Sequence, residues 1–171
     1  EAILRSAITQ DILREGPRGS MWAAHRDRTG AVTGWEERGP DWRGFATGGA
    51  KVLFRLGPVD GPRLCVAEAA IDAMSLAALE EQRPDTRYLS TGGGWSPASS
   101  EALLDLAVRA DALLVAATDN NAQGESFAAR LEALAADAGC GFVRLRPVLE
   151  DWNEDLKAGR RRKDGKKEDG C

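Results

Sequence analysis

The arrangement of hydrophobic and polar positions changes along the chain, near Pro62. Before this proline, apolar residues at near-helical spacing predict a short helix over residues 1–15. Two short runs on either side of the polar turn 26–30 predict a β-hairpin, and the apolar residues of 51–56 predict another strand. The glycine-rich stretch 41–49 is expected to be irregular. This part of the chain should therefore form a helix and a small antiparallel region.

After Pro62, short apolar runs that predict strands alternate with longer stretches that predict helices. The expected strands are 64–67, 87–90, 112–117 and 141–145. The expected helices are 70–81, 97–109 and 124–138. Alternation of this kind is typical of a parallel sheet with helices packed around it. The sequence therefore predicts an α/β fold, in which a Rossmann-like parallel sheet of about four strands with flanking helices follows the antiparallel region.

Composition narrows the class of protein. The 171 residues are 43% hydrophobic, which is enough for one full core, and no segment approaches the ~20 apolar residues of a membrane span. Three widely spaced cysteines and a single histidine argue against a disulfide framework, a zinc site or a histidine-built metal centre. The sequence does not open on a secretory signal. We expect a cytoplasmic protein without a membrane partner, in which oxygen atoms hold any metal.

The net charge of −4 conceals an uneven distribution. Residues 157–171 hold seven basic and three acidic groups, so the rest of the chain carries −8. An acidic body can hold cations while a basic tail contacts phosphates. The alternative is a solvated terminus with no such role. Residues 159–171 are expected to form a disordered basic tail.

Polar residues follow the expected strands of the parallel sheet. Glu68 follows the first strand, the glycine-rich stretch 91–94 the second, Asp119 and Asn121 the third, and Asp151 lies beyond the fourth. Ligands of open parallel sheets bind outside the carboxyl ends of the strands, so these residues should meet at one edge. Clustered carboxylates repel one another unless a cation lies between them, and such oxygen ligands select Mg²⁺ or Mn²⁺. The alternative, that Asp and Asn only cap the following helices, is preferred for a single junction but not for Glu68 and Asp119 together.

Three stretches after Pro62 resemble Toprim domains, the catalytic fold shared by bacterial primases and by type IA and type II topoisomerases. Residues 66–72 (Val-Ala-Glu-Ala-Ala-Ile-Asp) are similar to the glutamate motif of that family, and residues 118–124 (Thr-Asp-Asn-Asn-Ala-Gln-Gly) to its Asp-x-Asp motif. Residues 146–156 resemble the terminal aspartate motif of phage-type primase-helicases and bacterial primases. Upstream, 30–38 is similar to the hairpin that precedes the primase core, and 51–54 to its lysine motif.

Two positions depart from the family pattern. The glycine that usually follows the glutamate is Ala69, and the second acid of the Asp-x-Asp motif is Asn121. An asparagine keeps an oxygen ligand but removes one unit of charge, and metal affinity rises with the charge of the ligands. One of the family's metal positions should therefore be weakened, which puts full polymerase activity in doubt.

The resemblance implies a role for each candidate site residue. The implied catalytic residues are Glu68 and Asp119. The implied ligands of Mg²⁺ or Mn²⁺ are Glu68, Asp119, Asn121 and Asp151. The residues implied to contact a nucleotide or nucleic acid are Arg38, Lys51, Asp72, Gly92 and Gly93.

The function implied is primase-like nucleotidyl transfer during replication or mobilisation of plasmid or mobile-element DNA, with a single-stranded DNA template and nucleoside triphosphates as partners. Two alternatives stay open: a Toprim nuclease, and a catalytically weakened nucleic-acid-binding accessory domain of a mobilisation protein. The sequence contains no Walker A motif and no zinc ribbon, so a helicase or relaxase module would belong to a longer parent chain. The expected division is an N-terminal subdomain over 1–62 and a Toprim domain over 63–158, followed by the tail.

Overall fold

The computed structural model describes residues 1–159, and the expected tail lies almost entirely outside the described residues. In the described part, nine strands form one sheet in the order β4-β3-β2-β5-β7-β6-β8-β9, with β1 paired to β2. The strands are β1 (Leu13–Glu15), β2 (Met21–Arg26), β3 (Val32–Arg38), β4 (Arg43–Phe45), β5 (Leu53–Leu56), β6 (Arg63–Ala67), β7 (Thr86–Ser90), β8 (Leu113–Ala116) and β9 (Gly141–Arg144). The helices are α1 (Ala2–Thr9), the 3-10 turn η1 (Pro17–Gly19), α2 (Ala70–Leu79), α3 (Pro97–Ala107) and α4 (Ala122–Ala138). Residues 152–159 are also helical.

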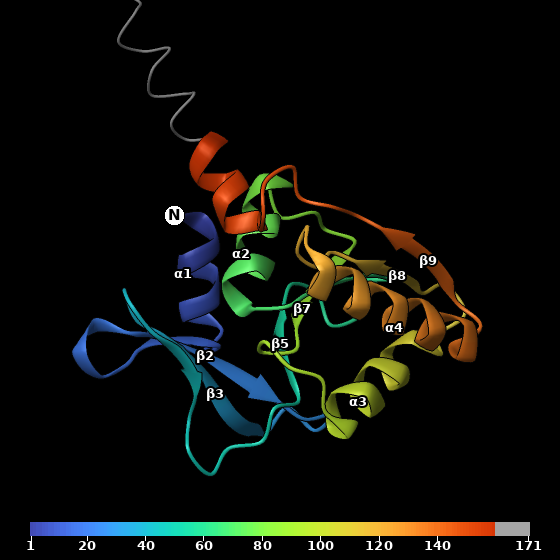
Figure 1. The fold of residues 1–171 in the computed structure, drawn as a ribbon. Helices are drawn as coiled ribbons and strands as arrows, with labels where there is room; N and C mark the ends of the chain where they lie inside the picture. The colour runs from blue at the N-terminus through green and yellow to red at the C-terminus, as the bar shows by residue number, and fades with distance from the viewer. Residues whose placement is uncertain (160–171) are drawn as a thin grey trace, which may run out of the picture.

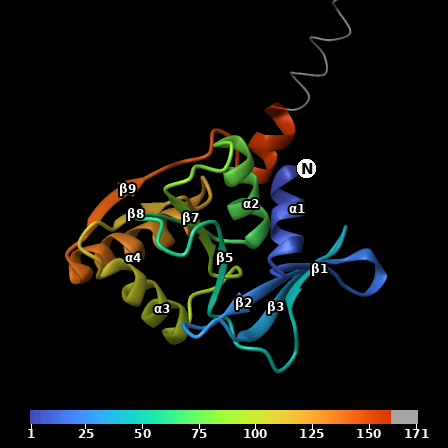
Figure 2. The ribbon, with the colours of Figure 1, turned by 180° about the vertical axis from the view of Figure 1, so that it is seen from behind.

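Four neighbouring strands, β7, β6, β8 and β9, run parallel to one another, which confirms the expected α/β fold. Helices cover both faces of this part of the sheet: α1 and α2 lie on one face, and α3 and α4 on the other (Figures 1 and 2). The side chains of β6 therefore enter two cores, with Cys65 in the first and Leu64 and Val66 in the second. Burial on both faces explains why this strand is a continuous apolar run rather than an alternating one.

The antiparallel strands extend the same sheet. Strand β5 pairs with β7, where Phe54 lies opposite Ser90, and with β2, where Phe54 lies opposite His25. Strand β2 then pairs with β3, and β3 with β4. Unbroken pairing from β3 to the parallel strands fixes the side chains of β3 and β4 relative to the ends of β6 and β8.

Three local expectations are corrected by the structure. The N-terminal helix ends at Thr9 rather than near residue 15, because the chain turns at Asp11 (φ 54°) and Leu13–Glu15 pairs with β2. Ile12 and Leu13 still enter the core, which explains their helix-like spacing. The stretch expected to be irregular contains β4, which pairs with β3 through Arg43–Phe45. The helix at 152–159 was not expected.

Among residues 1–159, no helix is long and apolar enough to cross a membrane.

Candidate active site

The carboxyl ends of the parallel strands and the strands β3 and β4 enclose a cavity of about 450 Å³. Every residue that the sequence singled out as a site residue lines it: Arg38, Lys51, Glu68, Asp72, Gly92, Gly93, Asp119, Asn121 and Asp151. Its wall also contains residues that the sequence analysis did not single out, among them Glu36, Arg43, Phe45, Gln123 and Glu150. The cavity therefore joins segments that lie more than a hundred residues apart in the sequence.

Glu68 directly follows β6 and is buried. Its Oε2 accepts a hydrogen bond from Gln123 Nε2 at 2.9 Å, and its Oε1 accepts one from the backbone N–H of Asp119 at 3.4 Å. Burial raises the pKa of Glu68, while these two bonds and the positive charges of Arg144 and Arg43 oppose the rise. Gln123 thus orients a carboxylate that is partly removed from water.

Asp119 follows β8 and has one oxygen, Oδ1, that is buried without a hydrogen-bond partner. Burial, followed by the charges of Glu68, Asp151 and Glu150, raises the pKa of Asp119 to about 7. Arg43 is the positive group that opposes this rise. A carboxylate oxygen without a donor, among other acids, is well suited to a cation.

The turn from Asp119 into α4 depends on a glycine. A Cβ atom at Gly124 would lie 2.0 Å from the backbone oxygen of Asp119, so no side chain fits there. The hydroxyl of Thr118 donates to the Gly124 carbonyl at 2.7 Å, and Asn121 Oδ1 accepts from the Gly124 N–H at 2.9 Å. Asn121 is therefore the N-cap of α4. Steric exclusion of any side chain explains why the stretch 118–124 ends in a glycine.

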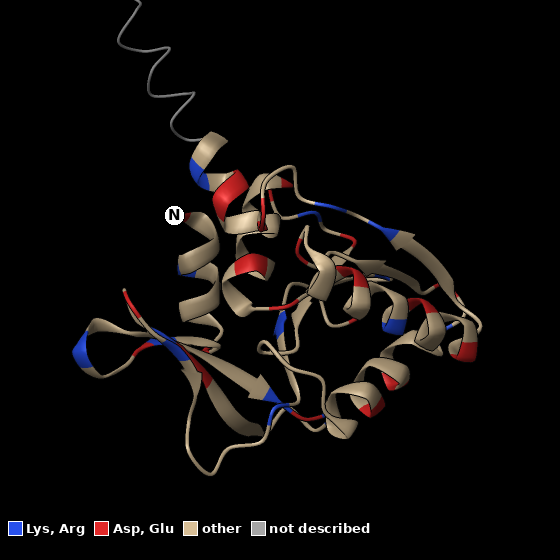
Figure 3. Cartoon of the chain, in the orientation of Figure 1, with Lys and Arg blue, Asp and Glu red and all other residues tan. Residues whose placement is uncertain are grey.

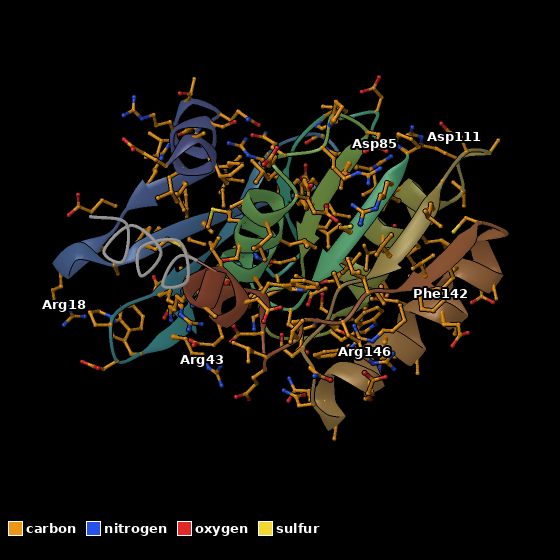
Figure 4. The ribbon with its side chains drawn as sticks, turned by 90° about the horizontal axis from the view of Figure 1, so that it is seen from above. Arg18, Arg43, Asp85, Asp111, Phe142 and Arg146 are labelled. Carbon is orange, nitrogen blue, oxygen red and sulfur yellow. The ribbon has the colours of Figure 1, made fainter. Side chains whose placement is uncertain are left out.

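An arginine that sequence reasoning missed fastens the end of β8. Arg144 donates from Nη1 to the carbonyls of Ala116 and Thr118, each at 3.0 Å, and from Nη2 to the carbonyl of Asp119 at 2.9 Å. Glu125 of α4 accepts from both Arg144 and Arg146 at 2.8 Å. Arg146 lies beside α4 in Figure 4. No sequence motif indicates Arg144, because its hydrogen bonds are made to backbone carbonyl groups that only the fold brings together.

Asp72 and Asp151 lie far apart in the sequence but line the same cavity. Asp72, on the first turn of α2, is 5% exposed, and its Oδ1 accepts from the backbone N–H of Asn153 at 3.2 Å. Burial, followed by the charges of Asp151 and Asp119, raises the pKa of Asp72 to about 7, while Arg38 opposes the rise. Asp151 Oδ1 accepts from the Glu154 N–H at 2.7 Å and caps the helical residues 152–159.

The four predicted metal ligands meet in the cavity without forming a ready-made coordination shell. Within residues 1–159, no three His, Cys, Asp or Glu side chains are arranged to hold a metal ion. Asn121 and Asp151 each use one oxygen as a helix cap. Glu68 and Asp119 fit a hard divalent cation best, because both offer carboxylate oxygens and Asp119 Oδ1 lacks a donor.

The opposite wall, called the basic wall here, carries Arg38, Arg43 and Lys51, together with Glu36 and Glu37. Lys51 Nζ donates to the carbonyl of Gly92 at 2.8 Å and lies 5.6 Å from the ring centroid of Phe45. Arg38 of β3 pairs in register with Arg43 of β4, and neither guanidinium forms a hydrogen bond or ion pair within the described residues. Arg43 is labelled in Figure 4, and Figure 3 shows the basic and acidic stretches of the chain. Arg43 was missed because its strand was expected to be irregular.

Comparisons with known protein families match both parts of the chain. The family model described as "Protein of unknown function (DUF3991)" matches residues 1–61, and the model described as "Toprim-like" matches residues 65–156. No curated protein matches the chain.

Solved structures of primases share the fold. The primase fragment of the bacteriophage T7 primase-helicase protein is 19% identical with a TM-score of 0.57, over 92% of this chain and 66% of that one. A chain in the structure of the T7 lagging-strand DNA polymerase with primase domains of two gp4 subunits is 21% identical with a TM-score of 0.60, over 92% and 82%. The Aquifex aeolicus primase (zinc binding and RNA polymerase domains) is 14% identical with a TM-score of 0.55, over 92% and 45%.

The chain thus spans between about half and four-fifths of the length of the primase chains that it resembles in structure. The expected resemblance is confirmed by the match that covers more than half of the sequence, from the last residues of β6 to the helical residues after Asp151. The chain belongs to the Toprim-like family.

Proposed function

We propose that this chain is the catalytic domain of a primase-like nucleotidyltransferase that depends on Mg²⁺ or Mn²⁺. The observation that carries the proposal is the shared cavity, which brings the acidic residues that follow β6 and β8 together with Arg38 of β3, Arg43 of β4 and Lys51. An acidic wall suits a divalent cation, and a basic wall suits phosphate groups. Nucleotidyl transfer requires both at one place.

The residues of the acidic wall divide into two roles. Glu68 and Asp119 would hold the divalent ion, with Asn121 and Asp151 close enough in the cavity wall to assist. The ion would neutralise phosphate charge and align the attacking and leaving oxygens. Gln123 keeps Glu68 oriented, and the raised pKa of Glu68 also suits it to accept or donate a proton near the reacting phosphate.

The residues of the basic wall would bind the nucleotide or the template. Arg38 and Arg43 have guanidinium groups without partners in the described residues, so their donors are available for bidentate contact with phosphate oxygens. Gly92 and Gly93 both have φ near +69°, a conformation that brings backbone groups to the cavity wall without side chains in between. Lys51 holds this loop and adds a positive charge.

The relatives supply the biological setting of the proposal. One structural relative is a fragment of a primase-helicase protein, and another belongs to a complex in which primase domains are bound to an RNA/DNA hybrid and dTTP. We therefore propose single-stranded DNA and nucleoside triphosphates as partners, and a helicase or relaxase module on a longer parent chain. We also propose that the protein acts in the cytoplasm on plasmid or mobile-element DNA. The support for this part of the proposal is the motif resemblance.

A template-directed incorporation assay tests the proposal. Wild-type protein should add labelled nucleotides on a single-stranded template when Mg²⁺ or Mn²⁺ is present, and Asp119→Ala should remove this activity because it deletes a proposed ligand. Shortened template strands instead of labelled products would indicate a nuclease. Binding of the template without either product would contradict an enzymatic role and support an accessory domain.

A further inference from the structure

A buried carboxylate connects the basic wall to the acidic wall. Glu36 of β3 is 6% exposed, and its two oxygens lie 3.0 and 3.1 Å from the backbone nitrogen of Ala70, the first residue of α2. Ser90, the last residue of β7, donates its hydroxyl proton to the same carboxylate at 3.3 Å. Glu36 therefore contacts two strand-end segments next to the proposed metal residues, and Ala70 is only two residues from Glu68.

A buried histidine lies beside this carboxylate, and neither of its ring nitrogens forms a hydrogen bond within the described residues. His25 is fully buried, and its Nε2 lies 3.6 Å from Glu36 Oε2. Its ring stands edge-on to Phe45, with centroids 5.0 Å apart. A Cβ atom at Gly92 would lie 2.9 Å from the ring, so His25 packs directly beneath the loop whose carbonyl receives Lys51. His25 is thus a buried residue of β2 that lies under the cavity.

We propose that Glu36, hydrogen-bonded to Ala70 and Ser90, is a positioning residue that fixes the two walls of the cavity relative to each other. This inference rests on the proposed function. Residues two apart on a strand share a face, so Glu36 lies on the same face of β3 as Arg38. Its carboxylate accepts the first amide of α2, the helix that carries Asp72 and follows Glu68. Without this acceptor, the start of α2 can shift relative to β3, and the acidic residues move away from the basic ones.

Titration with Mn²⁺ tests this inference on the full chain, with Glu36→Ala, Glu36→Gln and the matched control Leu103→Ala. Loss of a residue that supports metal ligands typically weakens metal binding by about 10-fold or more, so Glu36→Ala should lower Mn²⁺ affinity about tenfold. Glu36→Gln should recover most of this loss, because the amide oxygen can still accept from Ala70. Leu103 is fully buried in α3 away from the cavity, so Leu103→Ala should lower stability and leave Mn²⁺ affinity unchanged.

Equal Mn²⁺ affinity in folded Glu36→Ala and wild type would overturn the inference while leaving the proposed function intact. If wild type binds no Mn²⁺, the proposed function fails instead. The positioning role of Glu36 is then tested separately, by backbone amide hydrogen exchange over residues 66–72. Faster exchange there in Glu36→Ala than in Leu103→Ala supports positioning, and equal exchange overturns it.

Discussion

The two walls of the cavity differ in how their charged groups are held. On the acidic wall, Glu68 is bonded to Gln123, and Asp119 is fastened through its carbonyl to Arg144, so the carboxylates are held close together although they repel. On the basic wall, Arg38 and Arg43 have no partner in the described part of the chain. The difference is that neighbouring groups hold the carboxylates of the acidic wall in place, whereas the guanidinium donors of Arg38 and Arg43 stay available.

Gly124→Ala should produce the largest loss of stability and of Mn²⁺ binding, because it distorts the acidic wall and leaves the basic wall unchanged. A methyl group there would overlap the Asp119 carbonyl, and overpacking of this kind costs up to about 3 kcal/mol. We expect that loss in the free energy of unfolding, measured by denaturant titration, together with loss of Mn²⁺ binding. The matched control on the basic side is Gly44→Ala, where the nearest atom would be 3.8 Å away and stability should stay the same. Equal stability of the two variants would mean that the Asp119 turn tolerates a side chain.

Arg43→Ala should break the basic wall alone. The affinity for a nucleoside triphosphate should fall about tenfold, which is the loss of one charge-assisted phosphate contact of ~1.4 kcal/mol. Fluorescence titration with a labelled nucleotide measures it, and Arg28→Ala, an exposed arginine of the hairpin turn, serves as the control. Nucleotide affinity that falls equally in both variants would indicate bulk charge rather than a site at Arg43.

Asp72→Asn should show what it costs to keep a charged carboxylate buried near the other acids of this wall. The pKa of Asp72 is raised to about 7 from an ordinary value of 3.8, so the stability from its protonated form is complete below about pH 4 and is lost as the pH rises to about 7. Asparagine does not titrate and can still accept from Asn153. In the presence of a chelator, the variant and wild type should have the same melting temperature near pH 4. At pH 8 the variant should melt about 2–4 °C higher, which is the effect of ~1 kcal/mol of added stability in a protein of this size. A difference in melting temperature that is the same at both pH values would contradict the assignment.

Asn121→Asp should give the smallest change. Aspartate caps a helix as well as asparagine does, so α4 should keep its N-terminus. The added charge should raise Mn²⁺ affinity about threefold to tenfold, since hard cations bind more tightly to charged ligands. Calorimetric titration measures it. A fall, or no change, in Mn²⁺ affinity would mean that the side chain of residue 121 points away from the ion.

The sequence predicted the acidic wall better than the basic one, for physical reasons. Glu68 and Asp119 come one and three residues after the buried strands β6 and β8, so the topology of a parallel sheet places them together without knowledge of the side chains. The positions of Glu36 and Arg43 in the cavity wall depend on the register of antiparallel strands. The sequence of a short strand such as β4 does not indicate that register. Period-two spacing between Glu36 and Arg38 was the available signal for Glu36. Arg144 binds backbone carbonyls, and no residue pattern encodes such a contact.

The central claim is that the acidic wall binds a divalent cation and does not need the arginines of the basic wall to do so. Calorimetric titration of Mn²⁺ into wild type, Asp119→Ala and Arg43→Ala tests it most directly. We predict binding to wild type, loss of that binding in Asp119→Ala, and binding at least as tight as in wild type in Arg43→Ala, because Arg43 is a positive charge near Glu68 and Asp119. Unchanged Mn²⁺ affinity in folded Asp119→Ala would contradict the claim.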